Sequence, residues 1–118
     1  MMKTDALEIA RYYADWIDDS TLCKSIHTTR SYEFAMQLYM EFLETAKGVH
    51  STSFSSSNDF SQKNIKEWLV WLKSVRRCTP ESCNARLSSL KSFLKYLGGQ
   101  NIKYRYLYLD SLNVGRLK

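Results

Sequence analysis

The chain has little proline and glycine, with one Pro and four Gly in 118 residues. Because these residue types interrupt regular structure most strongly, their scarcity leaves long unbroken stretches and favours helices. No apolar run approaches the ~20 residues that a membrane-spanning helix needs, so we expect no membrane partner. The first residues carry acids instead of the apolar segment of a signal peptide. Three cysteines, an odd number without a paired framework, predict reduced thiols in a cytoplasmic protein.

The sequence also lacks a constellation of catalytic or metal-binding residues. His27 and His50 stand apart, in a connector and beside a loop. Cys78 and Cys83 are five residues apart with no second cysteine pair and no near histidine, which is too few ligands for a zinc site. Cys83 is instead predicted to be a small core residue. No glycine-rich phosphate loop occurs, because Gly98–Gly99 is predicted to end a helix. We therefore expect no cofactor, no metal and no catalytic activity in this chain.

Charge is distributed unevenly along the chain. Residues 1–60 hold five basic and nine acidic residues, a net charge of −4, whereas residues 61–118 hold twelve basic and three acidic residues, a net charge of +9. The two values together make the +5 of the whole chain. This asymmetry indicates a polyanionic partner for the second half. Two alternatives remain: the halves attract each other, or the acidic half faces a protein partner.

Residues 80–99 carry the clearest helix signals. Thr79 is suited to cap the first turn with its hydroxyl, Pro80 follows at the position where its missing N–H costs nothing, and Glu81 places negative charge at the positive end of the helix dipole. Gly98–Gly99 is predicted to end the helix in a left-handed conformation. Apolar residues at spacings of three and four predict a buried stripe: Cys83, Leu87, Leu90, Leu94 and Leu97.

A second side of this helix is polar and free of acids. Its members are Asn84, Ser88, Lys91, Ser92 and Lys95. Lysine pairs with phosphates, and short polar groups donate to phosphates or to base edges. This side therefore has the chemistry of a DNA-facing helix. The alternative is an ordinary solvated face whose lysines serve solubility.

Three further helices are expected before this one. Asp5 and Glu8 form a potential capping box for a helix that ends at about Asp19, with one apolar side: Leu7, Ala10, Ala14 and Ile17, with Tyr13 and Trp16 beside them. After a connector, Thr28 is predicted to cap a second helix that ends at Gly48. Its apolar stripe is Tyr32, Met36, Tyr39, Met40 and Leu43.

A serine-rich loop is predicted at Ser51–Asn58, anchored by Phe54. Ser61 is expected to cap a third helix, with an inward face made by Ile65, Trp68, Leu69, Leu72 and Val75. Trp71 is offset from that face, and large aromatic residues at such positions are predicted to belong to the core. The alternative is that Trp71 or Tyr96 forms a contact surface for another domain or subunit. Residues 101–118 have two readings: a strand, from the alternation of Tyr104, Tyr106 and Tyr108, or a short helix over Leu107–Val114.

These elements together resemble the N-terminal core-binding domain, also called the SAM-like domain, of tyrosine recombinases and phage integrases. The resemblance covers roughly residues 7–110. It is carried by Thr28-x-x-x-Tyr32 with Phe42-Leu43, then the serine-rich loop, then Asn64-Ile65-Lys66-Glu67-Trp68-Leu69-x-x-Leu72, and most specifically Asn84-x-Arg86-Leu87-Ser88-x-Leu90-x-Ser92-Phe93. It implies an all-α fold, a compact bundle of four to five helices.

The resemblance also implies a function. Such a domain grips one side of a recombination site in double-stranded DNA, while a separate catalytic domain of the same protein closes on the other side. The family's second and fourth helices approach the DNA, which by position implies these contacts: Arg30, Ser31 and Gln37, then Arg86, Ser88, Ser89, Lys91, Ser92 and Lys95. The polar face adds Asn84, and electrostatic docking adds Lys73, Arg76 and Arg77. For Arg86 the alternative is a structural ion pair.

The expected organisation is a DNA-binding domain over residues 1–110 and the start of a linker over residues 111–118. The nucleophilic tyrosine and its Arg, Lys and His partners would lie in a catalytic domain after residue 118, so this chain is predicted not to be an enzyme. Further recombinase protomers on DNA are potential partners. The competing hypothesis is a helical protein-interaction module without direct DNA contact. DNA-driven binding would collapse at high salt, and an aromatic interface would not.

Overall fold

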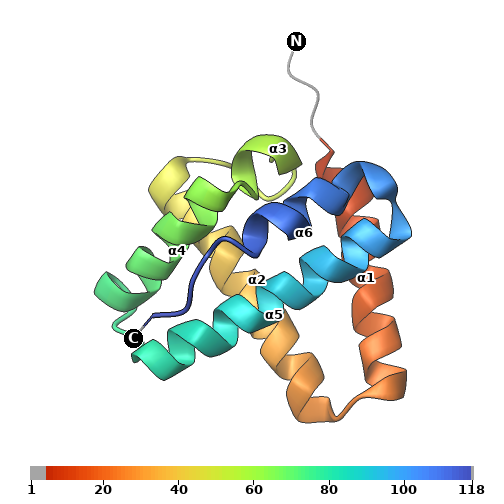
Figure 1. The fold of residues 1–118 in the computed structure, drawn as a ribbon, viewed down its shortest axis with the longest axis horizontal. Coiled ribbons are helices and arrows are strands. Elements are labelled where there is room, and N and C mark those ends of the chain that lie inside the picture. The colour runs from red at the N-terminus through yellow and green to blue at the C-terminus, as the bar shows by residue number, and fades with distance from the viewer. Residues whose placement is uncertain (1–4, 118) are drawn as a thin grey trace.

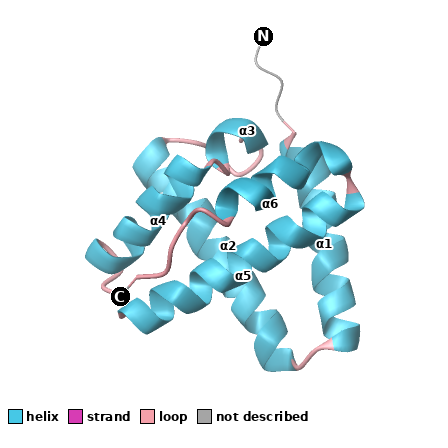
Figure 2. Cartoon of the chain, viewed as in Figure 1, coloured by secondary structure: helices cyan, strands magenta, loops and turns pink. Residues whose placement is uncertain are grey.

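The computed structural model describes residues 5–117 and, over that range, contains helices and no strands (Figures 1 and 2). The prediction of an all-α fold is therefore confirmed at the level of fold class. The elements are α1 Ala6–Cys23, α2 Ile26–Lys47, α3 Ser56–Asp59, α4 Gln62–Ser74, α5 Pro80–Gln100, the 3-10 turn η1 Ile102–Tyr104 and α6 Arg105–Ser111. The four long helices are those expected, and α6 lies in the tail, where a short helix was one of the two interpretations. The short helix α3 and a 3-10 turn were not expected.

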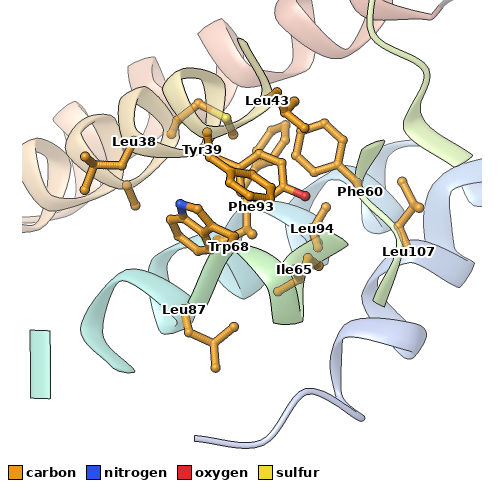
Figure 3. Close-up of a cluster of buried hydrophobic side chains, with 14 of the residues drawn as sticks. Leu38, Tyr39, Leu43, Phe60, Ile65, Trp68, Leu87, Phe93, Leu94 and Leu107 are labelled. Carbon is orange, nitrogen blue, oxygen red and sulfur yellow. The ribbon is translucent and has the colours of Figure 1, made fainter. Parts of the chain in front are cut away.

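Helix α5 is the centre of the bundle. It packs against α1, α2, α4 and α6, and it carries much of the core. Every residue of its predicted stripe, from Cys83 to Leu97, is buried, which confirms that prediction. Figure 3 shows Tyr39 of α2, Trp68 of α4 and Leu94 of α5 in one apolar cluster.

The start of α5 forms as predicted, but its end does not. The Thr79 hydroxyl accepts a hydrogen bond from the Ser82 N–H, and Pro80 occupies the first turn. The helix then continues through Gly98 and Gly99 to Gln100, so the expected stop at the glycines was wrong. Gly98 serves close packing instead, because a Cβ placed on it would lie 2.9 Å from the Arg105 Cα at the start of α6.

Helix α1 buries only part of the predicted side, since Trp16 is buried and Tyr13 and Ile17 are partly buried against the core. Leu7, Ala10 and Ala14 are exposed, whereas Ile9 and Trp16 are buried. The physical reason is aromatic packing, since the Trp16 ring stacks on Tyr32 of α2 with 4.2 Å between centroids and lies 5.3 Å from the ring of Phe93. The helix also runs on to Cys23, past the expected end at Asp19.

The capping box expected at the start of α1 is absent, because both acids bind distant residues. The Asp5 side chain makes no cap hydrogen bond. Its carboxylate instead accepts from the backbone N–H (2.8 Å) and hydroxyl of Ser56. Glu8 accepts from the Tyr104 hydroxyl and pairs with the Lys103 ammonium at 2.6 Å. The two acids therefore tie α1 to α3 and to η1.

Helix α2 begins three residues before the predicted position. Ser25, not Thr28, is its N-cap, and the Ser25 hydroxyl accepts from the Thr28 N–H. The predicted end at Gly48 is confirmed, with a left-handed φ of 66°. Met36, Tyr39 and Leu43 of the predicted stripe are buried, and its other two members are partly buried against the core.

Ser61 caps α4 as predicted, and the inward face of that helix is confirmed except at Val75, which is 62% exposed. Val75 falls just after the last residue of α4, where the chain turns toward α5. The serine-rich loop contains the short helix α3, which the loop prediction missed. Its expected anchor, Phe54, is buried and contacts the ring of Phe60.

The tail is helical, so the strand reading of its three tyrosines was wrong. Tyr104 lies in η1, and Tyr106 and Tyr108 lie in α6. Residues 112–117, called here the C-terminal segment, return from α6 and run between α4 and α5 (Figure 1). Val114 of this segment is 1% exposed. Residues 111–117, expected as the start of a linker, are therefore packed onto the bundle.

Candidate nucleic-acid interface

The polar side of α5 is divided by the fold. Ser88 and Lys95 are exposed and Ser92 is half-buried, with its hydroxyl donating to the Ser88 carbonyl at 3.0 Å. These three residues remain available to a partner. Asn84 and Lys91 lie on the flank that the C-terminal segment covers.

Asn84 is 7% exposed and is committed to the chain's own backbone. Its Nδ2 donates to the Leu117 carbonyl at 2.8 Å, and its Oδ1 accepts from the Leu117 N–H at 2.7 Å. Ser89 is also buried, at 6% exposure. Neither side chain reaches the surface, so the prediction of direct DNA contacts by these two residues does not fit this fold.

Lys91 is half-buried beside the C-terminal segment. Its Nζ donates to the Val114 carbonyl at 2.8 Å. Burial lowers the pKa of this ammonium, and the positive charge of Arg116 lowers it further. Arg116 is exposed two residues after Val114, and one bond to Val114 leaves the other two donors of the Lys91 ammonium free.

Arg86 forms a cation–π contact, not an ion pair. Its guanidinium carbon lies 4.5 Å from the ring centroid of Phe34 on α2. Arg30 and Gln37 are exposed and stand at helical spacing from Phe34, so they lie on the same side of α2 as this contact. Arg86 of α5 therefore lies at the side of α2 that carries Arg30 and Gln37. Ser31 is exposed on α2 as well.

The basic residues near the end of α4 have different surroundings. Arg76 pairs with Glu41 of α2 at 3.2 Å, so its charge is partly neutralised. Lys73 and Arg77 are exposed, and no ion pair involves either residue within residues 5–117. Arg77 has a φ of 55°, in the left-handed region, at the turn between α4 and α5.

Sequence reasoning missed two members of a basic row on α4. Lys63, Lys66 and Lys73 recur at helical spacing and are exposed, with Val70 between them. Arg77 follows in the turn. The one acid of α4, Glu67, is turned toward Lys47 of α2 and pairs with it. We call Lys63, Lys66, Lys73 and Arg77 the α4 basic row. Helical spacing of cations was the signal that would have found it.

A third basic location is an open hollow of about 460 Å³ beside α5, lined by Trp16, Lys24, Tyr32, Ser92, Lys95, Tyr96, Gly99 and Gln100. Lys24 was also missed, because it lies in the connector between α1 and α2 far from any basic cluster in the sequence. Burial, followed by the charge of Asp19 on α1, raises the pKa of Tyr96. The hollow is therefore bordered by charges of both signs.

The cysteine, tyrosine and tryptophan residues that could serve catalysis, metal binding or base stacking make contacts within the fold. Cys83 is buried, and its thiol contacts the Cys78 carbonyl at 3.8 Å. The Tyr104 hydroxyl donates to Glu8, and Trp71 lies against Phe42 with 5.8 Å between ring centroids. Across residues 5–117, no three His, Cys, Asp or Glu side chains are grouped so as to hold a metal ion. No helix in the same range has the length and apolar character to cross a bilayer.

Comparisons with models of protein families, with curated proteins and with solved structures found no match to this chain.

Proposed function

We propose that this chain binds double-stranded DNA as the N-terminal core-binding domain of a tyrosine recombinase. The observation that carries the DNA-binding part is the α4 basic row, a set of four exposed cations in which the one acid of α4, Glu67, is paired with Lys47. Lys91, bonded to Val114, and the exposed Arg116 add positive charge at the C-terminal segment. The recombinase part rests on the sequence resemblance alone.

The proposed mechanism begins with electrostatics. Lysine and arginine side chains of the α4 basic row neutralise phosphates and release their counterions, which makes the affinity depend steeply on salt. Ser88, Ser92 and Lys95 on the exposed side of α5 then supply short donors to phosphates or base edges. A domain that binds in this way has an affinity of roughly 10⁻⁴–10⁻⁶ M at physiological salt.

In this proposal the chain positions DNA and performs no chemistry. Strand cleavage would belong to a catalytic domain in the same protein. That domain, and other protomers on the same DNA, are the proposed protein partners.

The test is fluorescence anisotropy of a labelled duplex titrated with the protein at several salt concentrations. Lys66→Ala and Lys73→Ala are each expected to weaken binding and to reduce the salt slope by about one. Arg11→Ala is the matched control, because it removes one exposed charge from α1 in the acidic half. If all three variants and the unaltered chain have equal salt slopes, the α4 basic row is not part of the DNA-binding surface.

The second candidate function is protein interaction, and α6 carries the observation that favours it. Tyr106 and Leu109 on α6 and Leu112 just after it are 42%, 50% and 53% exposed. Side chains of this kind are typical of a contact with another protein. Binding that is insensitive to salt and lost in Leu109→Ser would support this function over DNA binding.

A further inference from the structure

The C-terminal segment is held against α5 by three side-chain hydrogen bonds. Asn84 makes two of them with the backbone of Leu117, and Lys91 makes the third with the carbonyl of Val114. Val114 is buried, and Leu117 packs partly buried against the core. Since these bonds use backbone atoms of the segment, they fix its path irrespective of the side chains it carries.

This path places Arg116 on the outside of the molecule. Val114 and Leu117 turn inward, whereas Gly115 and Arg116 between them are exposed. Arg116 therefore projects between two inward anchors, one of which, Val114, accepts the hydrogen bond from Lys91. We call the two hydrogen bonds between Asn84 and the backbone of Leu117 the Asn84 clamp. Without this clamp, the segment would lose the hydrogen bonds that hold Leu117, the residue immediately after Arg116.

We propose that Asn84 is a positioning residue that holds Arg116 beside Lys91, and that this pair forms a phosphate-binding part of the DNA surface. The inference rests on the proposed function and adds a residue, Arg116, that sequence reasoning did not assign. It also gives Asn84 an indirect role in place of the base contact expected from its position on α5.

The charges around the pair support an anionic ligand. No ion pair involves Lys91 or Arg116 among residues 5–117. Two unneutralised cations repel each other, and a phosphate between them relieves that repulsion. The bond from Lys91 to Val114 occupies only one of three ammonium donors, so the side chain retains capacity for a phosphate oxygen.

The opposite role, a cover that keeps DNA away from α5, is less well supported. Val114 is as deeply buried as the core leucines of α5, which indicates that the segment is part of the packed fold. Displacing it would also break both hydrogen bonds of the Asn84 carboxamide and expose the buried side chain of Val114 to water. The segment therefore adds its own charge to the surface.

The experiment measures duplex affinity by anisotropy between about 50 mM and about 200 mM salt for Asn84→Ala, Arg116→Ala and the double variant. Asn113→Ala is the control for loss of a carboxamide, since Asn113 is exposed in the same segment. Arg11→Ala is the control for loss of a charge. Hydrogen exchange at the Leu117 amide reports the clamp independently of DNA, because that N–H donates to Asn84.

We expect both single variants to reduce the salt slope by about one, so that the affinity drop across this range becomes roughly threefold smaller. The double variant should lose no more than either single variant, because both changes remove the same contact. Leu117 exchange should accelerate in Asn84→Ala and stay slow in Arg116→Ala.

Three outcomes would overturn the inference. If Arg116→Ala leaves the salt slope of duplex affinity unchanged while the unaltered chain binds normally, the inference is wrong and the proposed function is unaffected. Tighter binding by Asn84→Ala would show that the segment shields the surface. Absence of salt-dependent binding by the unaltered chain would overturn the proposed function itself and this inference with it.

Discussion

At the scale of single residues, Glu8 shows how one carboxylate joins parts of the chain that lie far apart in sequence. It accepts from the Tyr104 hydroxyl and pairs with Lys103, whose ammonium also lies 5.0 Å from the Tyr104 ring centroid. The bond with Lys103, followed by the bond with Tyr104, lowers the pKa of Glu8 below its usual 4.5. The start of α1 is thereby tied to η1 in a manner that depends on pH.

The pH dependence of this tie is testable. A carboxyl whose pKa is lower in the folded state stabilises the fold above its unfolded value of 4.5, and this contribution disappears as the pH falls through the folded value. We expect the unaltered chain to melt at a higher temperature than Glu8→Gln at pH 7. The difference should shrink steadily below about pH 4.5 in thermal melts followed by circular dichroism.

Comparison with Glu8→Gln isolates this one group from the other carboxyls, which titrate in both proteins. A difference in melting temperature that stayed constant from pH 7 down to pH 3 would contradict the assignment. Tyr104 provides a second readout, since burial and then the bond to Glu8 raise the pKa of its hydroxyl.

At the scale of elements, the last turn of α5 contains two adjacent glycines in different surroundings. A Cβ on Gly98 would meet the Arg105 Cα at 2.9 Å, whereas a Cβ on Gly99 would meet nothing within 4 Å. Gly98 therefore permits α6 to fold back closely against α5. Gly99 has no such role in the packing of these helices.

The two glycines predict opposite effects of the same substitution. Gly98→Ala is expected to destabilise the protein by about 1–3 kcal/mol, because a backbone atom must move. Gly99→Ala should be neutral or stabilising by about 0.5–1 kcal/mol, since alanine has the better helix propensity. Urea unfolding of both variants measures the difference, and equal effects would contradict the close approach of α6.

At the scale of the whole molecule, stability depends on a core to which every long helix contributes. Figure 3 shows this cluster, with Leu94 of α5 among side chains from α2, α4 and α6. We expect Leu94→Ala to reduce the free energy of unfolding by about 2–5 kcal/mol.

Leu22→Ala is the control, since Leu22 is 85% exposed near the end of α1 and should change stability by less than about 0.5 kcal/mol. Both values come from urea unfolding, and a small effect at Leu94 would indicate that α5 is not the centre of one cooperative unit.

The sequence by itself determined those features whose causes lie within a few neighbouring residues. The caps at Ser61 and Thr79 and the end of α2 at Gly48 depend on local hydrogen-bond and backbone preferences, and all three form at the predicted residues. The buried stripe of α5 was equally predictable, because five apolar residues at helical spacing leave only one side to bury.

Tertiary structure decided the features that depend on which distant segment packs against a given residue. Asp5 and Glu8 had the spacing of a capping box, but Ser56 and Tyr104 became their partners. Asn84 was expected on an open polar side of α5, but its side chain forms hydrogen bonds with the backbone of Leu117, 33 residues later in the chain. A polar side chain forms hydrogen bonds with whichever donor or acceptor the fold brings near, and the spacing of residues along one helix does not reveal which distant residue that is.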